Sequence, residues 1–109
     1  MSDFFDDGFT EEFTIPAEEN VNGELTITYR PALTEQVGKL LDVTENDEKY
    51  MKVAIDMLPK LLTGWTLKDR NSVVVTINRD NIARVRRPLL VKIIDRVFFG
   101  SKVGDALKN

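Results

Sequence analysis

Hydrophobic and polar residues alternate in two short runs in the first third of the chain. Each run places apolar or aromatic residues at every second position with threonine between them, which is the pattern of a strand with one buried face. Asn22-Gly23 lies between the runs and indicates a turn, because both residues tolerate positive φ. We therefore predict two antiparallel strands, the second of which is closed off by Pro31. The expected buried positions are Phe13, Ile15, Leu25, Ile27 and Tyr29.

The middle of the chain has the apolar spacing of helices. A short helix can begin at Thr34, although Gly38 within it lowers helix propensity. A stronger helix is predicted to begin after Thr44, whose hydroxyl can cap the free amides of the first turn. Pro59 should kink this helix or end its regular part, and Gly64 is placed to stop it. The apolar face of the stronger helix comprises Met51, Ala54, Ile55, Leu58, Leu61 and Leu62.

A run of β-branched residues over 73–77 predicts a third strand. Asn78 or Thr76 can cap a short helix that follows it. Pro88 is expected at the first position of the last helix, because the residue before a proline is pushed out of helical geometry. Gly100 should end that helix. The last helix is apolar over more than half of its circumference, through Leu89, Leu90, Ile93, Ile94, Val97 and Phe98.

These patterns predict one α+β domain over residues 1–109. We expect a small antiparallel sheet of two to three strands and a mainly helical body of three to four helices. A chain of 109 residues is long enough for a single core and too short for two. A loosely ordered acidic arm at about 1–12 and a frayed tail at about 101–109 are expected to flank the domain.

Composition excludes most chemistry. The chain has no cysteine, which rules out disulfides and thiolate metal sites, and no histidine, the commonest metal ligand and general base. It has no glycine-rich phosphate loop, and its paired acids lie in segments expected to be flexible. We therefore expect no enzyme activity and no catalytic, cofactor-binding or metal site. No apolar run approaches the roughly 18–20 residues of a membrane helix, and the start lacks a signal-peptide pattern, so a cytoplasmic protein without membrane contact is expected.

The net charge of −3 conceals a gradient along the chain. Residues 1–29 contain eight acids and no base, whereas residues 79–109 contain eight bases and three acids. Two solvated faces would explain this gradient, and so would attraction between the ends, within one chain or head-to-tail between chains. A third reading is a row of phosphate-binding bases in a small nucleic-acid-binding protein, which the acidic total disfavours. The row would comprise Arg79, Arg84, Arg86, Arg87, Lys92 and Arg96.

Short motifs follow one another along residues 25–99. They are Tyr29-Arg30-Pro31, Leu61-Leu62-Thr63-Gly64-Trp65-x-Leu67-Lys68-Asp69, Thr76-Ile77-Asn78-Arg79-Asp80-Asn81-Ile82-Ala83-Arg84 and Pro88-Leu89-Leu90. With these motifs in this order, the chain resembles the small tail assembly chaperones of long-tailed bacteriophages. It departs from the family pattern at Arg86-Arg87, where an apolar residue is expected before the proline, and its Val73-Val74-Val75 run is more apolar than usual.

The resemblance implies a binding role in the cytoplasm of a bacterial host. Chaperones of this family coat the long tape-measure protein, keep it soluble and help tail-tube subunits assemble around it, so the tape-measure and tail-tube proteins are the expected partners. Many are made in two lengths by translational frameshifting, and this chain would correspond to the short form. The alternative is a structural phage component, such as a head-tail joining or tail-terminator protein, which would form a stable ring by itself.

Four phenylalanines are the expected partner-binding residues. Phe98 and Phe99 are adjacent on a predicted helix, so they cannot both face the same core. Phe4 and Phe5 lie in the acidic arm, where aromatic residues are unusual for a disordered tail. We expect these four residues to contribute to homo-oligomer formation or to client binding. The alternative is that the second phenylalanine of the helix is covered by the chain's own arm.

Overall fold

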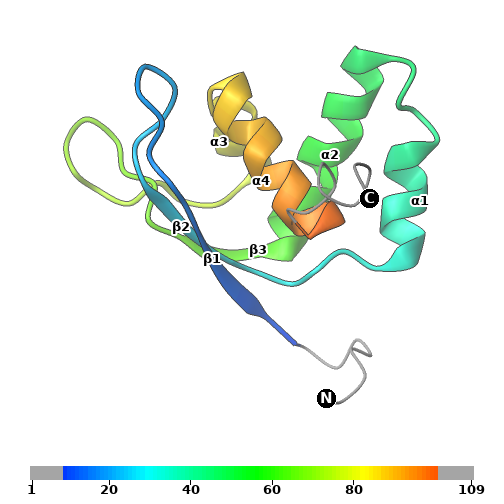
Figure 1. The fold of residues 1–109 in the computed structure, drawn as a ribbon, viewed down its shortest axis with the longest axis horizontal. Coiled ribbons are helices and arrows are strands. Elements are labelled where there is room, and N and C mark those ends of the chain that lie inside the picture. The colour runs from blue at the N-terminus through cyan, green and yellow to red at the C-terminus, as the bar shows by residue number, and fades with distance from the viewer. Residues whose placement is uncertain (1–8, 101–109) are drawn as a thin grey trace.

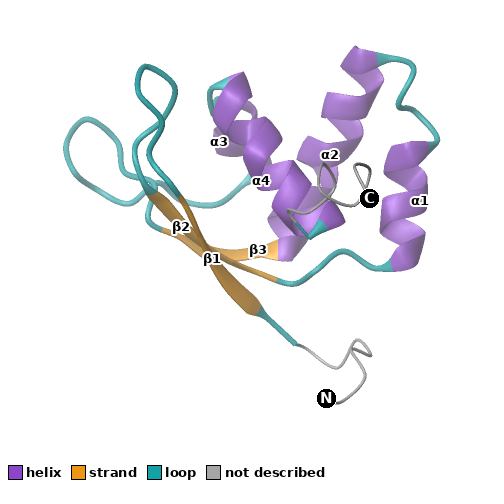
Figure 2. Ribbon diagram, viewed as in Figure 1, coloured by secondary structure: helices purple, strands orange, loops and turns teal. Residues whose placement is uncertain are grey.

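The computed structural model describes residues 9–100, which form a three-stranded antiparallel sheet and four helices (Figures 1 and 2). The α+β class predicted from the sequence is therefore confirmed. The predicted tail at 101–109 and most of the predicted arm lie outside the described residues, whereas residues 11 and 12 belong to the first strand. The elements in chain order are β1 (Glu11–Ile15), β2 (Leu25–Tyr29), α1 (Thr34–Leu41), α2 (Asp47–Leu61), β3 (Leu62–Trp65), α3 (Arg79–Ala83) and α4 (Arg87–Phe99).

The sheet has the order β1-β2-β3, with β2 in the centre. The first two strands are antiparallel, as predicted, and their pairing sets Glu11 opposite Tyr29 and Ile15 opposite Leu25. Along β2 every second side chain is buried, and the threonines between them are half-buried on the opposite face. On that face the hydroxyls of Thr14 and Thr26 lie 2.9 Å apart. One face of the sheet is therefore apolar and packed, and the other is rich in threonine.

The turn between β1 and β2 is not at Asn22-Gly23, where the sequence pattern had predicted it. The chain reverses at residues 19–21 instead, between Glu18 and Asn22, which form an isolated bridge. Within this turn Asn20 has φ of 63°. The side chain of Asn22 instead donates to the carbonyl of Pro16 at 3.0 Å and stiffens the loop. Asparagine supplies the left-handed residue here, because its short polar side chain tolerates that conformation.

The third strand is β3, directly after α2, and the prediction of a strand at 73–77 is wrong. Gly64 lies inside β3 and does not stop the helix. The helix continues through Pro59 to Leu61, and the chain becomes extended at Leu62. Strand formation there buries the side chains at both ends of β3, which β2 and the helices cover. Tertiary packing thus outweighs the high β-propensity of the valine run.

The helix ends follow local capping chemistry, with two corrections. Asn46 caps α2 by accepting from the amide of Lys49 at 3.0 Å, whereas Thr44 donates to a carbonyl of the preceding turn. Asn78 caps α3, as predicted. The residue outside helical geometry before α4 is Arg86, so the helix begins one residue before Pro88. Gly100 ends α4 with φ of 70°, as predicted.

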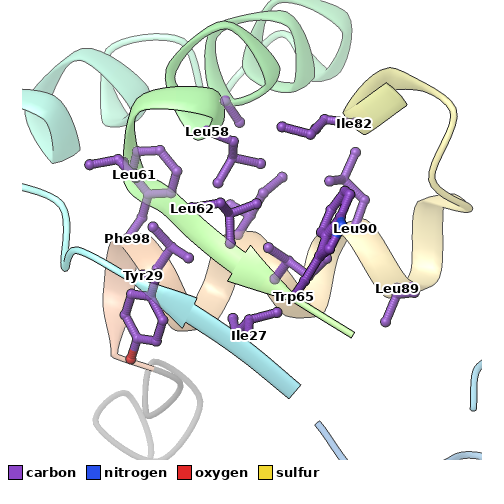
Figure 3. Close-up of a cluster of buried hydrophobic side chains, with 14 of the residues drawn as sticks. Ile27, Tyr29, Leu58, Leu61, Leu62, Trp65, Ile82, Leu89, Leu90 and Phe98 are labelled. Atoms are coloured by element: carbon purple, nitrogen blue, oxygen red, sulfur yellow. The ribbon is translucent and has the colours of Figure 1, made fainter. Parts of the chain in front are cut away.

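The core lies between the apolar face of the sheet and the helices (Figure 3). All six apolar positions predicted for the last helix are buried. In Figure 3, Leu58 of α2, Trp65 of β3 and Leu90 of α4 gather in one cluster, and Tyr29 turns its hydroxyl out of it. Among residues 9–100 no buried side chain is polar or charged apart from the Tyr and Trp counted in this core. The polar groups are therefore left to the rim and the loops, where partners can reach them.

Candidate functional site

The four predicted partner-binding phenylalanines fall into two sets. Phe4 and Phe5 lie outside the described residues. Phe98 is 5% exposed and belongs to the core, whereas Phe99 is half-buried and packs against the edge of the core. Their ring centroids are 6.5 Å apart, with the ring planes tilted by 47°. Of this pair, Phe99 therefore presents more surface to a partner.

A pocket of about 340 Å³ lies at the C-terminal end of α4, and we call it the α4-end pocket. Its apolar wall includes Val97 and Phe98 of α4 and Leu33 of the β2–α1 connection. The side chain of Leu33 is 42% exposed. The amide of Ala32 donates to the carbonyl of Val97 at 3.0 Å and holds this connection against the helix. The pocket is lined by Phe9, Glu11, Tyr29, Pro31, Ala32, Leu33, Thr34, Arg96, Val97, Phe98 and Gly100.

The polar side of the α4-end pocket is a hydrogen-bonded chain of side chains. The hydroxyl of Tyr29 donates to Oε2 of Glu11 at 2.8 Å and accepts from Nε of Arg96 at 2.8 Å. The guanidinium of Arg96 also lies 3.9 Å from the ring centroid of Phe13, a cation–π contact. Burial, followed by the hydrogen bond with Glu11, raises the pKa of Tyr29 above its ordinary value. Tyr29 therefore stays neutral and joins β1, β2 and α4.

A larger groove of about 920 Å³ lies between the β1–β2 loop, residues 66–76 and the start of α4, and we call it the loop groove. Val73 and Val74 line it with side chains that are 59% and 51% exposed. The sequence analysis assigned these residues to a third strand and did not predict their exposed position in a groove. The lining comprises Val21, Asn22, Gly23, Glu24, Leu25, Thr66, Leu67, Lys68, Asp69, Val73, Val74, Val75, Thr76, Asn81, Arg84, Val85, Arg86 and Leu89.

The loop that presents these valines is held by polar contacts at both ends. The carboxylate of Asp69 accepts from the amides of Asn71 at 2.8 Å and Val73 at 3.1 Å, and Ser72 is left-handed with φ of 64°. The indole N–H of Trp65 donates to the carbonyl of Val75 at 2.7 Å. The sequence Asp69-Arg70-Asn71-Ser72 is rich in turn-forming residues, but this composition does not show that the next residues are exposed.

Most of the predicted basic row is used within the chain. Arg79 contacts Asp56 at 2.5 Å, Lys92 contacts Glu18 at 2.5 Å, and Arg87 pairs with Asp47. Arg96 binds the Tyr29 hydroxyl, as described above. The two remaining members, Arg84 and Arg86, are exposed, line the loop groove and form no ion pair within the described part of the chain. The row is thus reduced to one pair of available cations.

Residues 9–100 contain no group of three or more acidic, histidine or cysteine side chains that could hold a metal ion. Across the same stretch, no helix is both long and apolar enough to cross a membrane. No protein-family model, no curated protein and no solved structure matches the chain.

Proposed function

We propose that this chain is a non-enzymatic tail assembly chaperone of a long-tailed bacteriophage. In this role it binds the tape-measure protein in the host cytoplasm, keeps it soluble and helps tail-tube subunits assemble around it. The series of motifs across residues 25–99 supports the choice of family. The α4-end pocket is the observation that carries the binding role, because it combines an apolar wall with a charged rim.

The client for such a pocket is an amphipathic helix. A helix that lies in an apolar groove inserts side chains spaced three or four residues apart, and its polar face remains in water. Leu33 and Phe99 offer apolar contacts at this end of the molecule, and Arg96 with Glu11 offers charges of both signs at the rim. A tape-measure protein, as a long helical rod with apolar stripes, supplies many copies of this kind of ligand.

Co-expression with the tape-measure protein tests the proposal, with the soluble fraction of the client as the readout. Leu33→Asp should lower the soluble fraction severalfold, because a carboxylate at a pocket rim opposes apolar docking. Leu41→Asp is the matched control, since Leu41 is 51% exposed and lies outside the pocket. Phe99→Ser should weaken client binding or self-association. The proposed role is refuted if the client is as soluble with Leu33→Asp and Phe99→Ser as with the Leu41→Asp control. It is also refuted if the client is equally soluble without the chain.

The internal pairing of bases argues against nucleic acid as the main partner. Phosphate binding needs a row of available cations, and Arg79, Lys92 and Arg87 are already paired with acids in the chain. Absence of DNA binding at low salt is the expected result, and a steep loss of measurable affinity with added salt would favour the rival function.

A further inference from the structure

We propose that the loop groove binds the acidic N-terminal segment, residues 1–8, of a second copy of this chain, so that copies associate head-to-tail. The inference concerns contact between copies and holds whatever the client at the α4-end pocket is. It starts from two features of the groove that no contact within residues 9–100 satisfies. These features are a pair of strongly exposed valines, Val73 and Val74, and three cations without an ion-pair partner, Lys68, Arg84 and Arg86.

The groove and the segment are complementary in charge and in apolar character. Residues 1–8 contain three aspartates, two phenylalanines and no basic side chain. The groove offers Arg84, Arg86 and Lys68 beside its valines, and it also contains the acids Glu24 and Asp69. The three bases outnumber the two acids, and the carboxylate of Asp69 is held toward two backbone N–H groups of its own loop. Aromatic anchors flanked by charges are the usual form of a peptide contact of this kind.

The geometry of the hairpin favours a second copy over the same chain. Leu25 lines the groove and pairs with Ile15, so the groove lies at the loop end of β1. Phe9 lines the α4-end pocket beyond the opposite end of that strand, and the described chain enters β1 from the side away from the β1–β2 loop (Figure 1). Phe9 and Ile15 are separated by about 20 Å of extended chain. Even a fully extended segment carries Phe4 at most about 17 Å back from Phe9. The phenylalanines of the segment therefore fall short of the groove of their own chain.

A contact of this kind joins two different surfaces, one at each end of the molecule. Repetition of such a heterologous contact produces a closed ring where the rotation closes and an open helical array where it does not. Either product presents the α4-end pocket at regular intervals along the assembly. A long client with repeated apolar stripes would then meet a row of equivalent sites.

Sedimentation velocity over a range of protein concentrations is the first test. The full chain should form larger species as concentration rises, and a chain lacking residues 2–8 should remain a monomer. Added salt should weaken the association of the full chain, because exposed charges are screened beyond about 10 Å at 0.1 M ionic strength. A full chain that is monomeric at every concentration, or a deletion that associates equally well, overturns the proposal. Binding of the segment within its own chain would show no dependence on concentration and would also overturn it.

Charge reversal supplies the sharper test. Arg84→Glu with Arg86→Glu in the groove, and separately Asp6→Lys with Asp7→Lys in the segment, should each raise the dissociation constant at least about tenfold at low salt. Mixing the two double variants should restore association, because the native segment of the groove variant meets the native groove of the segment variant, and the reversed segment meets the reversed groove. Failure of the mixture to associate overturns the proposed pairing.

The matched control is Lys39→Glu with Lys60→Glu. Both lysines are exposed on helices and lie outside the loop groove, and their reversal changes the net charge by the same amount. This control should leave the dissociation constant within about twofold of the full chain, because exposed charges remote from a contact act weakly. An equal loss in the control would mean that total charge, and not the groove, governs association, and the proposal would be overturned.

Discussion

The hydroxyl of Tyr29 links β1, β2 and α4 through its hydrogen bonds with Glu11 and Arg96. Tyr29→Phe removes one bond to Glu11 and one to Arg96 and leaves both partners beside an apolar ring. We expect the free energy of unfolding to fall by about 1–2 kcal/mol, because each side chain loses a partner in a partly buried site. Urea denaturation followed by circular dichroism measures this change.

The chain offers its own control for that prediction. Tyr50 is also partly buried, but its hydroxyl forms no hydrogen bond with the side chains or backbone described for residues 9–100. Tyr50→Phe should therefore change the free energy of unfolding by much less than Tyr29→Phe. Equal effects of the two substitutions would mean that the bonds of Tyr29 contribute no net stability.

Asp95 gives the chain a stability term that depends on pH. Burial raises the pKa of Asp95 above its ordinary value of 3.8, so folding favours the protonated carboxyl over the ionised one. At neutral pH the ionised group therefore opposes folding, and this cost disappears as the pH falls below the unfolded value. Asp95→Asn should raise the free energy of unfolding at pH 7, and the two proteins should converge below about pH 4. A variant that is less stable at pH 7 contradicts this assignment.

Among the elements, α2 begins at a cap that can be tested directly. Asn46→Ala removes the side-chain acceptor for the amide of Lys49 and should cost about 1 kcal/mol of stability. Thr44→Ala is the comparison, because the Thr44 hydroxyl donates to a carbonyl of the preceding turn and not to an α2 amide. Its cost should be clearly smaller in the same denaturation experiment. The reverse order would restore Thr44 as the functional cap.

The sequence predicts the elements that are determined locally and misses the strand that is determined by packing. The hairpin strands and the main helices follow from apolar periodicity, and the caps at Asn78 and Gly100 follow from side-chain and backbone chemistry. The third strand does not, because Leu62–Trp65 is short and contains a glycine. It forms only because β2 offers an open edge beside the end of α2, which no window of sequence displays.

The candidate sites were less predictable than the elements for the same reason. The α4-end pocket is formed by a strand, the β2–α1 connection and the last helix. Leu33 and Val97, which are far apart in the sequence, both line it. The adjacent phenylalanines of the last helix predicted a partner contact there, but no pattern in the sequence indicated Leu33 as a pocket residue. For the loop groove, the valines had been assigned to a third strand, so their exposure could emerge only from the folded arrangement.

The last helix, α4, contacts the β1–β2 loop near the start of the chain and covers the core. Lys92 of α4 contacts Glu18 at 2.5 Å and Asn22 at 2.8 Å in the β1–β2 loop, and the six buried side chains of α4 complete the core. A fragment that ends at residue 86 should therefore lack the cooperative unfolding transition of the full chain, because the sheet loses its apolar cover. Circular dichroism during urea titration checks this. A cooperative transition in the fragment would show that α4 is dispensable for folding.

The direct passage from α2 into β3 also limits how the chain length can vary. Leu61 ends the helix and Leu62 begins the strand, so no residue is available to absorb an insertion between them. One extra residue there would turn the following chain by about 100° if it joined the helix, or move every β3 side chain to the opposite face of the sheet if it joined the strand. The loop over 66–78 has no such constraint on its tip. Length differences among related chains should therefore accumulate in that loop and be absent from the junction.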